Sequence, residues 1–247
     1  MSNKPNICDY ADTNYSKDFW GNNKRLYEDI VERNALHKLL PAQGNSFLDM
    51  GAGFGRLTDE YAIRYKKVTL FDYAQNLLDE AKIKHKKYHN IDYVQGDIYN
   101  LPFKDETFDG GLSVRVMHHI EDVSKVFAEL NRVMQKNGKF VLEYANKHNV
   151  LEIIRFLTFQ KNAGPFKLAP AKRGNSVFWN FHPLHIEGEL KKAGFKIEKV
   201  LSVSMFRSAF LKKVFGDKLL ARIENHLSGI LGRLRLSPSV FLLIKKE

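Results

Sequence analysis

The sequence has one cysteine, Cys8, and only 7 prolines among its 247 residues. A single cysteine excludes an internal disulfide framework and a cysteine-based zinc cluster, and it fits a reducing compartment. HExxH is absent and no H-x-E pattern suggests a metal, so we expect no bound metal. No apolar run approaches the roughly 18 residues of a membrane span. The polar stretch 1–15 lacks the apolar segment of a signal peptide, and we therefore expect a cytoplasmic protein.

The rest of the composition is ordinary for a globular protein, with 44% hydrophobic and 27% charged residues. The formal net charge of +11, however, is unevenly distributed along the chain. Residues 1–160 hold 22 basic and 22 acidic side chains, whereas residues 161–247 hold 17 basic and 6 acidic ones. Such an excess is typical of a face that meets an anionic partner, and equally of a plain solvated basic surface.

Short apolar runs alternate with stretches of helical spacing along the chain. The helical spacing predicts helices over 22–40, 56–65, 74–86, 123–134, 183–193 and 209–232. The short runs predict strands over 46–50, 68–71, 91–94, 108–114, 139–144, 195–203 and 240–244. This alternation predicts a Rossmann-like, doubly wound α/β fold, with a mostly parallel seven-stranded sheet and helices on both faces. Turn residues in 148–182 predict an irregular insertion over the sheet.

A glycine-rich loop follows the first predicted strand. Gly51-Ala52-Gly53-Phe54-Gly55 comes directly after that strand, and a helix is predicted from about Arg56. Glycines let the backbone turn sharply and approach a ligand, and a helix N-terminus offers free N–H groups. Asp72, 21 residues after Gly51, ends the next predicted strand. Since doubly wound folds bind the ribose diol of adenosine cofactors with an acid at this place, the loop and Asp72 together indicate an adenosine-containing cofactor.

Two features of the loop favour S-adenosylmethionine over a dinucleotide. The dinucleotide pattern G-x-G-x-x-G needs a glycine where this sequence has Arg56, because the third glycine comes one residue early at Gly55. Asp49 precedes the loop, and a carboxylate there disfavours a pyrophosphate but favours an ammonium or sulfonium group. An NAD-dependent oxidoreductase remains the alternative, since Asp72 suits the ribose of either cofactor.

The segment 47–55, FLDMGAGFG, resembles motif I of the class I S-adenosylmethionine-dependent methyltransferases, in the methyltransferase type 11 or ubiquinone/menaquinone group. Later motifs of the family are resembled, in order, by 68–72, by 96–98 with 101–103, by 108–120, and by 130–134 with 137–139. The resemblance covers about residues 45–145, with a weaker similarity at 189–195. It implies a methyltransferase in one domain, 1–247. We expect an N-terminal lid and helix at 1–44, a cofactor-binding core at 45–145, and substrate-side insertions at 146–182 and 204–236.

The resemblance also implies which residues bind the methionine part of the cofactor. Asp49 and the three loop glycines, Gly51, Gly53 and Gly55, would face this end. Val114, at the end of the fourth predicted strand, would lie under it. The carboxylate and the close backbone of the loop are the groups that an α-ammonium and a sulfonium need.

The resemblance further implies which residues bind the adenosine part of the cofactor. Asp72 would bind the ribose hydroxyls, and Tyr73 would lie on the adenine face. Asp97 would accept a hydrogen bond from the adenine amino group, with Ile98 beside the ring. Core packing is the alternative interpretation for Tyr73 and Ile98.

Methyl transfer from a sulfonium is an in-line displacement that depends on alignment and on the protonation state of the nucleophile, so the chain needs a shaped pocket and at most one base. Tyr144 and His148 follow the fifth predicted strand, at the edge where the acceptor should lie, and form the preferred catalytic pair. His119 is a third candidate, with a structural role in a His-His pair as its alternative. Among the N-terminal aromatics, Tyr10 and Tyr15 are lid candidates, while Phe19 and Trp20 are expected to staple the first helix to the sheet.

The fourth predicted strand leads into SVRV rather than the Asn/Asp-Pro-Pro-aromatic motif of enzymes that methylate exocyclic amines. We therefore expect a small-molecule acceptor, anionic or lipid-like, methylated on O, N or C. RNA modification through the basic last third stays an alternative. Since no RNA-binding module accompanies the fold, nucleic acid is not the expected partner.

Residues 209–236 combine an apolar helical stripe with basic charge. The stripe consists of Leu220, Ile223, Leu227, Ile230 or Leu231, and Leu234. The basic residues around it are Lys212, Lys213, Lys218, Arg222, Arg233 and Arg235. Such a helix covers its own core, contacts a second subunit or lies on an anionic membrane, and the oligomeric state is left open. We predict salt-sensitive binding to anionic vesicles.

Overall fold

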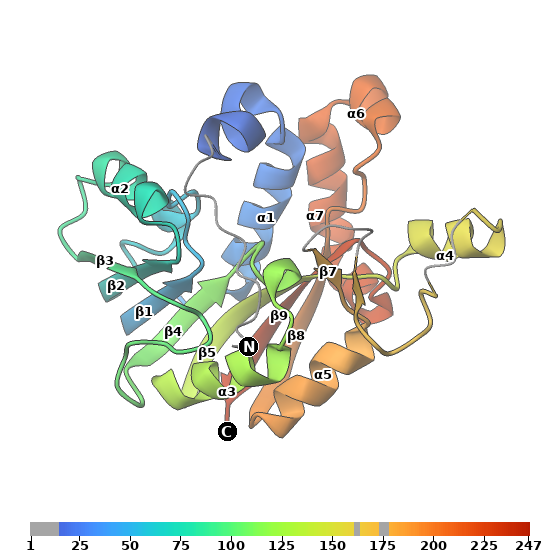
Figure 1. Ribbon diagram of the computed structural model, residues 1–247. Helices are drawn as coiled ribbons and strands as arrows, with labels where there is room; N and C mark the ends of the chain where they lie inside the picture. Colours follow the sequence, from blue (N-terminus) through green and yellow to red (C-terminus); the bar gives the residue numbers. More distant parts are fainter. Residues whose placement is uncertain (1–14, 161–163, 173–177) are drawn as a thin grey trace, which may run out of the picture.

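The computed structural model describes residues 15–160, 164–172 and 178–247 (Figure 1). Its centre is a seven-stranded sheet of order β3-β2-β1-β4-β5-β9-β8, in which only β9 runs antiparallel to its neighbours. The strands are β1 (Gly44–Met50), β2 (Tyr65–Asp72), β3 (Ile91–Gln95), β4 (Phe108–Ser113), β5 (Met134–Ala145), β8 (Phe195–Val203) and β9 (Ser239–Lys246). The predicted fold class, a mostly parallel seven-stranded Rossmann-like sheet, is confirmed.

Helices cover both faces of the sheet and build two apolar cores. One face carries α1 (Leu26–Leu39), α2 (Gln75–Lys84) and α7 (Asp217–Leu234). The other carries α3 (Val123–Val133) and α5 (Pro183–Lys192). Local sequence explains where the last two begin: the Asp122 carboxylate accepts a hydrogen bond from the backbone of Lys125, and Pro183 occupies the first turn of α5.

Short elements complete the described chain. They are the π-helix η1 (Ser16–Trp20), the 3₁₀ turns η2 (Gly21–Asn23), η3 (Thr58–Glu60) and η4 (Met117–His119), helices α4 (Val150–Leu157) and α6 (Ala209–Phe215), and a two-stranded sheet of β6 (Ala171–Lys172) and β7 (Trp179–Asn180). In Figure 1, α4 and α6 project from the body of the molecule. Within the described residues, no helix is long and apolar enough to cross a membrane.

The helix predicted over 56–65 is wrong. The chain forms a series of tight turns around η3, held by i→i−3 bonds such as Tyr61 N–H to Thr58 O at 3.2 Å. Tertiary contacts override helical propensity here, because the Tyr61 ring stacks on Phe47 at 4.4 Å and its hydroxyl donates to Asp49. No α-helix N-terminus therefore follows the glycine loop.

Two other expectations need correction. The helical segment predicted over 209–232 is two helices, because Gly216 between α6 and α7 has φ +76°. The insertion at 148–182, expected to be irregular, contains α4. Its sequence VLEIIRFL has Glu152 and Arg155 on one side of the helix, but it is only 8 residues long, and so short an apolar run does not distinguish a helix from a strand.

Candidate active site

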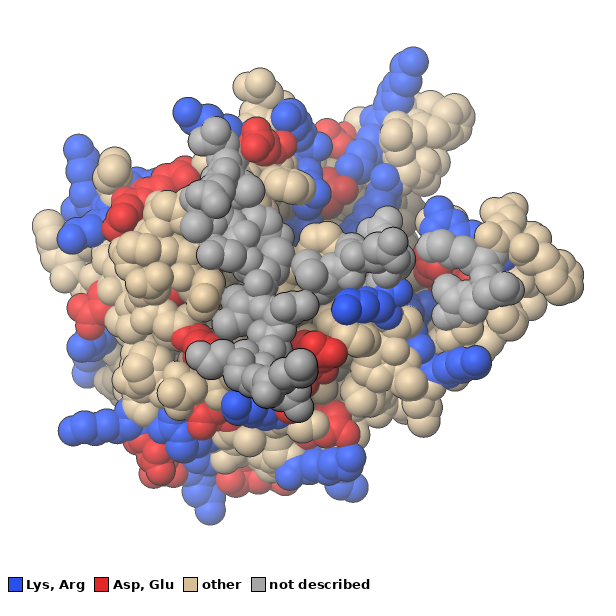
Figure 2. Space-filling model, viewed as in Figure 1, with Lys and Arg blue, Asp and Glu red and all other residues tan. Residues whose placement is uncertain are grey.

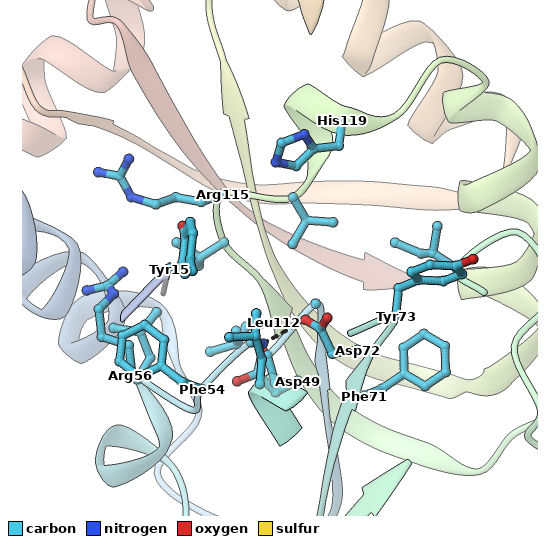
Figure 3. Close-up of a pocket in the computed structure, with 18 of the residues that line it drawn as sticks. Tyr15, Asp49, Phe54, Arg56, Phe71, Asp72, Tyr73, Leu112, Arg115 and His119 are labelled. Carbon is cyan, nitrogen blue, oxygen red and sulfur yellow. Dashed lines mark hydrogen bonds between the residues drawn. The ribbon is translucent and has the colours of Figure 1, made fainter. Parts of the chain in front are cut away.

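A pocket opens at the carboxyl ends of β1, β2 and β4 (Figure 3). Eight of the residues expected to bind the cofactor line it: Asp49, Gly51, Gly53, Asp72, Tyr73, Asp97, Ile98 and Val114. They come from strand ends and the loops that follow them, which the parallel order of the sheet places side by side. Gly55 is the expected cofactor residue that lies outside the lining.

The three glycines of the loop are needed for different reasons. A Cβ on Gly51 would lie 2.2 Å from Val116 Cγ2, and a Cβ on Gly55 would lie 2.9 Å from the His85 ring, so both positions are constrained by packing. Gly53 has φ +53°, and a Cβ there would meet only Leu77 at 3.8 Å. Gly53 is thus the glycine whose missing side chain leaves room in the pocket, and Gly55 is a packing residue.

Asp72 holds the loop in place from the end of β2. Its Oδ2 accepts the backbone N–H of Gly53 at 2.7 Å, and its Oδ1 accepts that of Ala74 at 2.9 Å. One carboxylate therefore joins the glycine loop to the start of α2. Carboxylate oxygens have further lone pairs, so these bonds are compatible with hydroxyl donors from a ribose.

Asp49 is a buried acid in the pocket wall, only 3% exposed. Burial raises the pKa of its carboxyl to about 7, the negative charge of Asp72 adds to the rise, and the hydrogen bond from Tyr61 opposes it. A cation placed beside this carboxylate gains more than one placed in water, because little solvent screens the pair. The loop end of the pocket is suited to a positively charged group.

The far end of the pocket has a flat apolar shape with one acid. Ile98 packs against the core behind it, while Tyr73 is 41% exposed at the rim. Asp97 Oδ1 accepts the backbone N–H of Tyr99 at 2.9 Å, which fixes the loop after β3. A planar ring with an exocyclic amino group fits between such walls.

Opposite the acids, Figure 3 shows Arg115, Tyr15 and His119. Arg115 was not expected from sequence. Its Nε donates to Glu32 Oε1 of α1 at 2.8 Å, and its backbone N–H donates to Glu143 Oε2 of β5 at 2.8 Å. These contacts hold its backbone at φ +63° and its guanidinium at the pocket wall.

The ring of Trp20 contacts two arginine side chains at this wall. Its ring lies 3.8 Å from the Arg56 guanidinium carbon and 5.0 Å from that of Arg115. Both arginines also pair with the buried Glu32. Trp20, expected to staple the first helix to the sheet, also lines the pocket, and Arg56 is an ion-paired residue of the same wall.

The three other N-terminal aromatics considered in the sequence analysis differ in position. Tyr15 lines the pocket, with its ring 6.3 Å from that of Phe54, which agrees with the position expected of a lid residue. Phe19 lies 5.0 Å from the Tyr15 ring and outside the lining. Tyr10 lies outside the described residues.

Of the three expected bases, the structure brings only His119 to the pocket. Burial lowers the pKa of His119 to about 4, so its imidazole is neutral near pH 7 and able to accept a proton. Its ring lies 4.0 Å from that of His118.

Tyr144 and His148 are not brought to the pocket. Tyr144 is fully buried in the core on the α5 face of the sheet, since side chains of β5 alternate between the two faces. His148 lies past the end of β5, with its ring 5.0 Å from His182 and 5.6 Å from Phe166. Reaching the right edge of the sheet was therefore not sufficient to place either side chain in the pocket.

Comparison with known proteins identifies the part of the chain that builds this pocket. Residues 48–142 match the family model described as a methyltransferase domain. This segment is similar to that family over less than half of the chain. The chain is 30% identical over 108 residues to norajmaline N-methyltransferase of Rauvolfia serpentina, covering 42% of this chain and 37% of that protein. It is 29% identical over 101 residues to demethylmenaquinone methyltransferase of Thermobifida fusca, covering 40% of this chain and 43% of that protein.

The chain thus spans less than half the length of these two curated relatives. A solved structure titled as a putative S-adenosylmethionine dependent methyltransferase from Listeria monocytogenes has the same fold, with a TM-score of 0.65 at 18% identity over 90% of this chain and 100% of that one. Residues 48–142 thus resemble a methyltransferase domain, as the sequence motifs indicate, and the Rossmann-like fold is confirmed.

Proposed function

We propose that this chain transfers a methyl group from S-adenosylmethionine to a small-molecule acceptor, anionic or lipid-like, bound between Arg115 and His119. The observation that carries the proposal is the pair of acids at the glycine loop. Asp49 is buried in the wall and Asp72 ties down Gly53. Such a loop suits a ligand with a cationic amino-acid end and a ribose.

In this proposal each part of the pocket holds one part of the cofactor. The carboxylate of Asp49 faces the α-ammonium group, and the absence of a side chain at Gly53 provides the space that this group occupies. Asp72 accepts from the ribose hydroxyls, and Asp97 accepts from the adenine amino group, with Ile98 and Tyr73 beside the ring. When bound, S-adenosylmethionine supplies an activated methyl group on sulfur.

The same geometry disfavours the NAD alternative. A pyrophosphate needs the N–H groups of a helix N-terminus, and here the loop is followed by turns around η3. It would also lie beside Asp49, whose carboxylate repels it.

The acceptor binds and reacts at the wall of the pocket opposite the two acids. A neutral His119 at the pocket wall accepts the proton that an O–H acceptor loses as its oxygen takes the methyl group. Tyr15, Trp20 and Ile120 exclude water there, and the guanidinium groups of Arg56 and Arg115 attract negative charge on the acceptor. The cytoplasm, which the single cysteine favours, is the proposed compartment.

The test is a screen of small anionic and quinone- or phenol-type acceptors with methyl-labelled S-adenosylmethionine, followed by variants of the base. His119→Ala should lower kcat by about 100-fold or more without weakening S-adenosylhomocysteine binding. His148→Ala is the matched control and should leave kcat unchanged. Equal losses in the two variants would refute the role of His119.

A further inference from the structure

Exposed apolar side chains are concentrated in two segments of the molecule. One is α4 with the turn after it, and the other is α6 with α7. The residues are Val150, Leu151, Ile154, Phe156, Leu157, Phe159, Phe210, Val214, Phe215, Leu219, Ile223, Leu227, Ile230 and Leu234. Neither α4 nor α6 has a single buried residue, although both are mostly apolar. Patches of this size on a soluble surface mark interaction sites.

Helix α7 carries two distinct faces. Leu220, Ala221, Glu224, Ser228 and Gly232 are buried against the body of the protein. A second stripe is apolar and exposed, and it consists of Leu219, Ile223, Leu227, Ile230 and Leu234, with Ile230 68% exposed. Its spacing of three and four residues keeps it on one side of the helix. The stripe expected from the sequence is therefore corrected at Leu220, which faces the core, while the rest of it faces outward.

The helices that carry the exposed groups adjoin one another. Helix α6 ends at Phe215 and α7 begins at Asp217, so their apolar residues are neighbours. At its other end α7 meets the start of α4, where the backbone N–H of Val150 donates to Leu236 O at 2.9 Å. Figure 1 shows α6, α7 and α4 on the side of the molecule away from α2. We call these exposed residues of α4, α6 and α7 the outer surface.

Basic charge accompanies the outer surface. Lys213, Lys218, Arg222 and Arg233 are exposed, and the described residues offer none of them an ion pair. Lys212 and Arg235, the other two basic residues expected around the stripe, pair with Glu28 and Glu187. Blue side chains lie beside the α6 tip in Figure 2.

We propose that the outer surface docks on an anionic lipid bilayer, with the apolar side chains in the headgroup region and the four basic residues against lipid phosphates. A helix lying in a membrane interface has this combination of an apolar stripe and flanking Lys and Arg. A second copy of the chain is a poorer occupant, because a symmetric contact brings the same four positive charges together without acids to meet them. The proposal does not depend on which acceptor is methylated.

The experiment is co-sedimentation of the full chain with vesicles of phosphatidylcholine, alone or mixed with phosphatidylglycerol. The protein should bind the mixed vesicles at low salt, and binding should fall about tenfold or more in 0.5 M salt or without phosphatidylglycerol, because each basic residue near an anionic surface contributes ~1 kcal/mol that salt screens. Absence of binding to the mixed vesicles at low salt would overturn the proposal.

Paired variants test the surface itself. The double variant Ile223→Ser with Ile230→Ser should lose vesicle binding, while Ile63→Ser with Ile83→Ser should not, although Ile63 and Ile83 are more exposed, at 81% and 75% against 40% and 68%. All four side chains face solvent, so thermal unfolding should stay unchanged. Equal loss in the two double variants contradicts the proposal.

Two further experiments test the role of the basic residues and the possibility that the chain forms a dimer. Lys218→Glu with Arg222→Glu should weaken binding to the mixed vesicles about tenfold or more, whereas Lys66→Glu with Lys82→Glu, on the far side, should not. Sedimentation equilibrium without lipid should show a monomer. A dimer that Ile223→Ser with Ile230→Ser dissociates would assign the surface to a second copy and overturn the membrane proposal.

Discussion

The carboxylate of Asp72 accepts the backbone N–H of Gly53 at 2.7 Å, so the acid that ends β2 fixes the loop that follows β1. The two residues are 19 positions apart in the chain. The same oxygen atoms lie where ribose hydroxyls are proposed to bind. Cofactor binding and loop geometry are therefore coupled through one side chain.

Replacing Asp72 tests this coupling. Asp72→Ala removes charge-assisted hydrogen bonds worth ~1.5–3 kcal/mol each, so S-adenosylhomocysteine should bind at least about tenfold more weakly. Asp79→Ala, which removes an exposed acid on α2, is the control and should bind normally. Isothermal titration calorimetry measures both, and wild-type affinity in Asp72→Ala would contradict the ribose assignment.

Gly53 and Gly216 form a matched pair of glycines with positive φ. At either position alanine is strained by about 1 kcal/mol or slightly more, and the protein leaves room for its Cβ. Only at Gly53 does that Cβ enter the pocket. Gly53→Ala should weaken S-adenosylhomocysteine binding clearly more than Gly216→Ala, while the two lower the melting temperature to a similar degree. Equal affinities would remove Gly53 from the site.

The raised pKa of Asp49 predicts that the affinity for the cofactor depends on pH. Because burial raises its pKa to about 7, the carboxylate that attracts an ammonium group is mostly protonated at pH 6. Affinity for S-adenosylhomocysteine should rise about tenfold from one pH unit below this pKa to the plateau above it. Asp49→Asn should bind weakly, with no such rise. A flat profile in the wild-type protein would show that Asp49 does not face the ammonium group.

The same pKa makes a prediction for stability. In the unfolded chain this carboxyl titrates near its ordinary value of 3.8, so between that value and about 7 the folded protein holds a proton that the unfolded chain lacks. The stabilisation from this group is complete below pH 4 and is lost as the pH rises through 7. In the ligand-free protein, Asp49→Asn should therefore raise the melting temperature more at pH 8 than at pH 5. The reverse order in thermal unfolding scans would contradict a raised pKa.

Glu32, which supports two arginines of the pocket wall, should be a costly acid to remove. It is 1% exposed and bridges Arg56 and Arg115, so Glu32→Gln removes the ion pair of Arg115 and leaves Arg56 with Asp29 alone. The free energy of unfolding should fall by ~3 kcal/mol or more. Asp92→Asn, which breaks an exposed pair with Lys67, should cost about 1 kcal/mol or less. Urea denaturation compares them, and similar losses would refute the bridging role.

Residues expected at the site line the pocket where the sequence signal was local. Gly51, Gly53, Asp72 and Asp97 lie at or just after strand ends, and the order of a parallel sheet brings strand ends together. Sequence reasoning failed where distant segments decide. Arg115 is positioned by Glu32, 83 residues away, and no spacing along the chain reveals that contact.

Two further misses have a single cause, the competition between local pattern and tertiary packing. The predicted helix over 56–65 gave way to turns that bring Tyr61 to Asp49. Tyr144 lies at the expected edge of the sheet, but the pleat directs its side chain into the core of the other face. A strand pattern gives the edge at which a residue lies, while the face depends on register.

The most direct measurement of the central claim is calorimetric titration of the full chain with S-adenosylhomocysteine and, separately, with NADH. We predict one binding site for S-adenosylhomocysteine that Asp72→Ala weakens, and no binding of NADH at the same concentrations. Binding of NADH with no heat from S-adenosylhomocysteine would contradict the account.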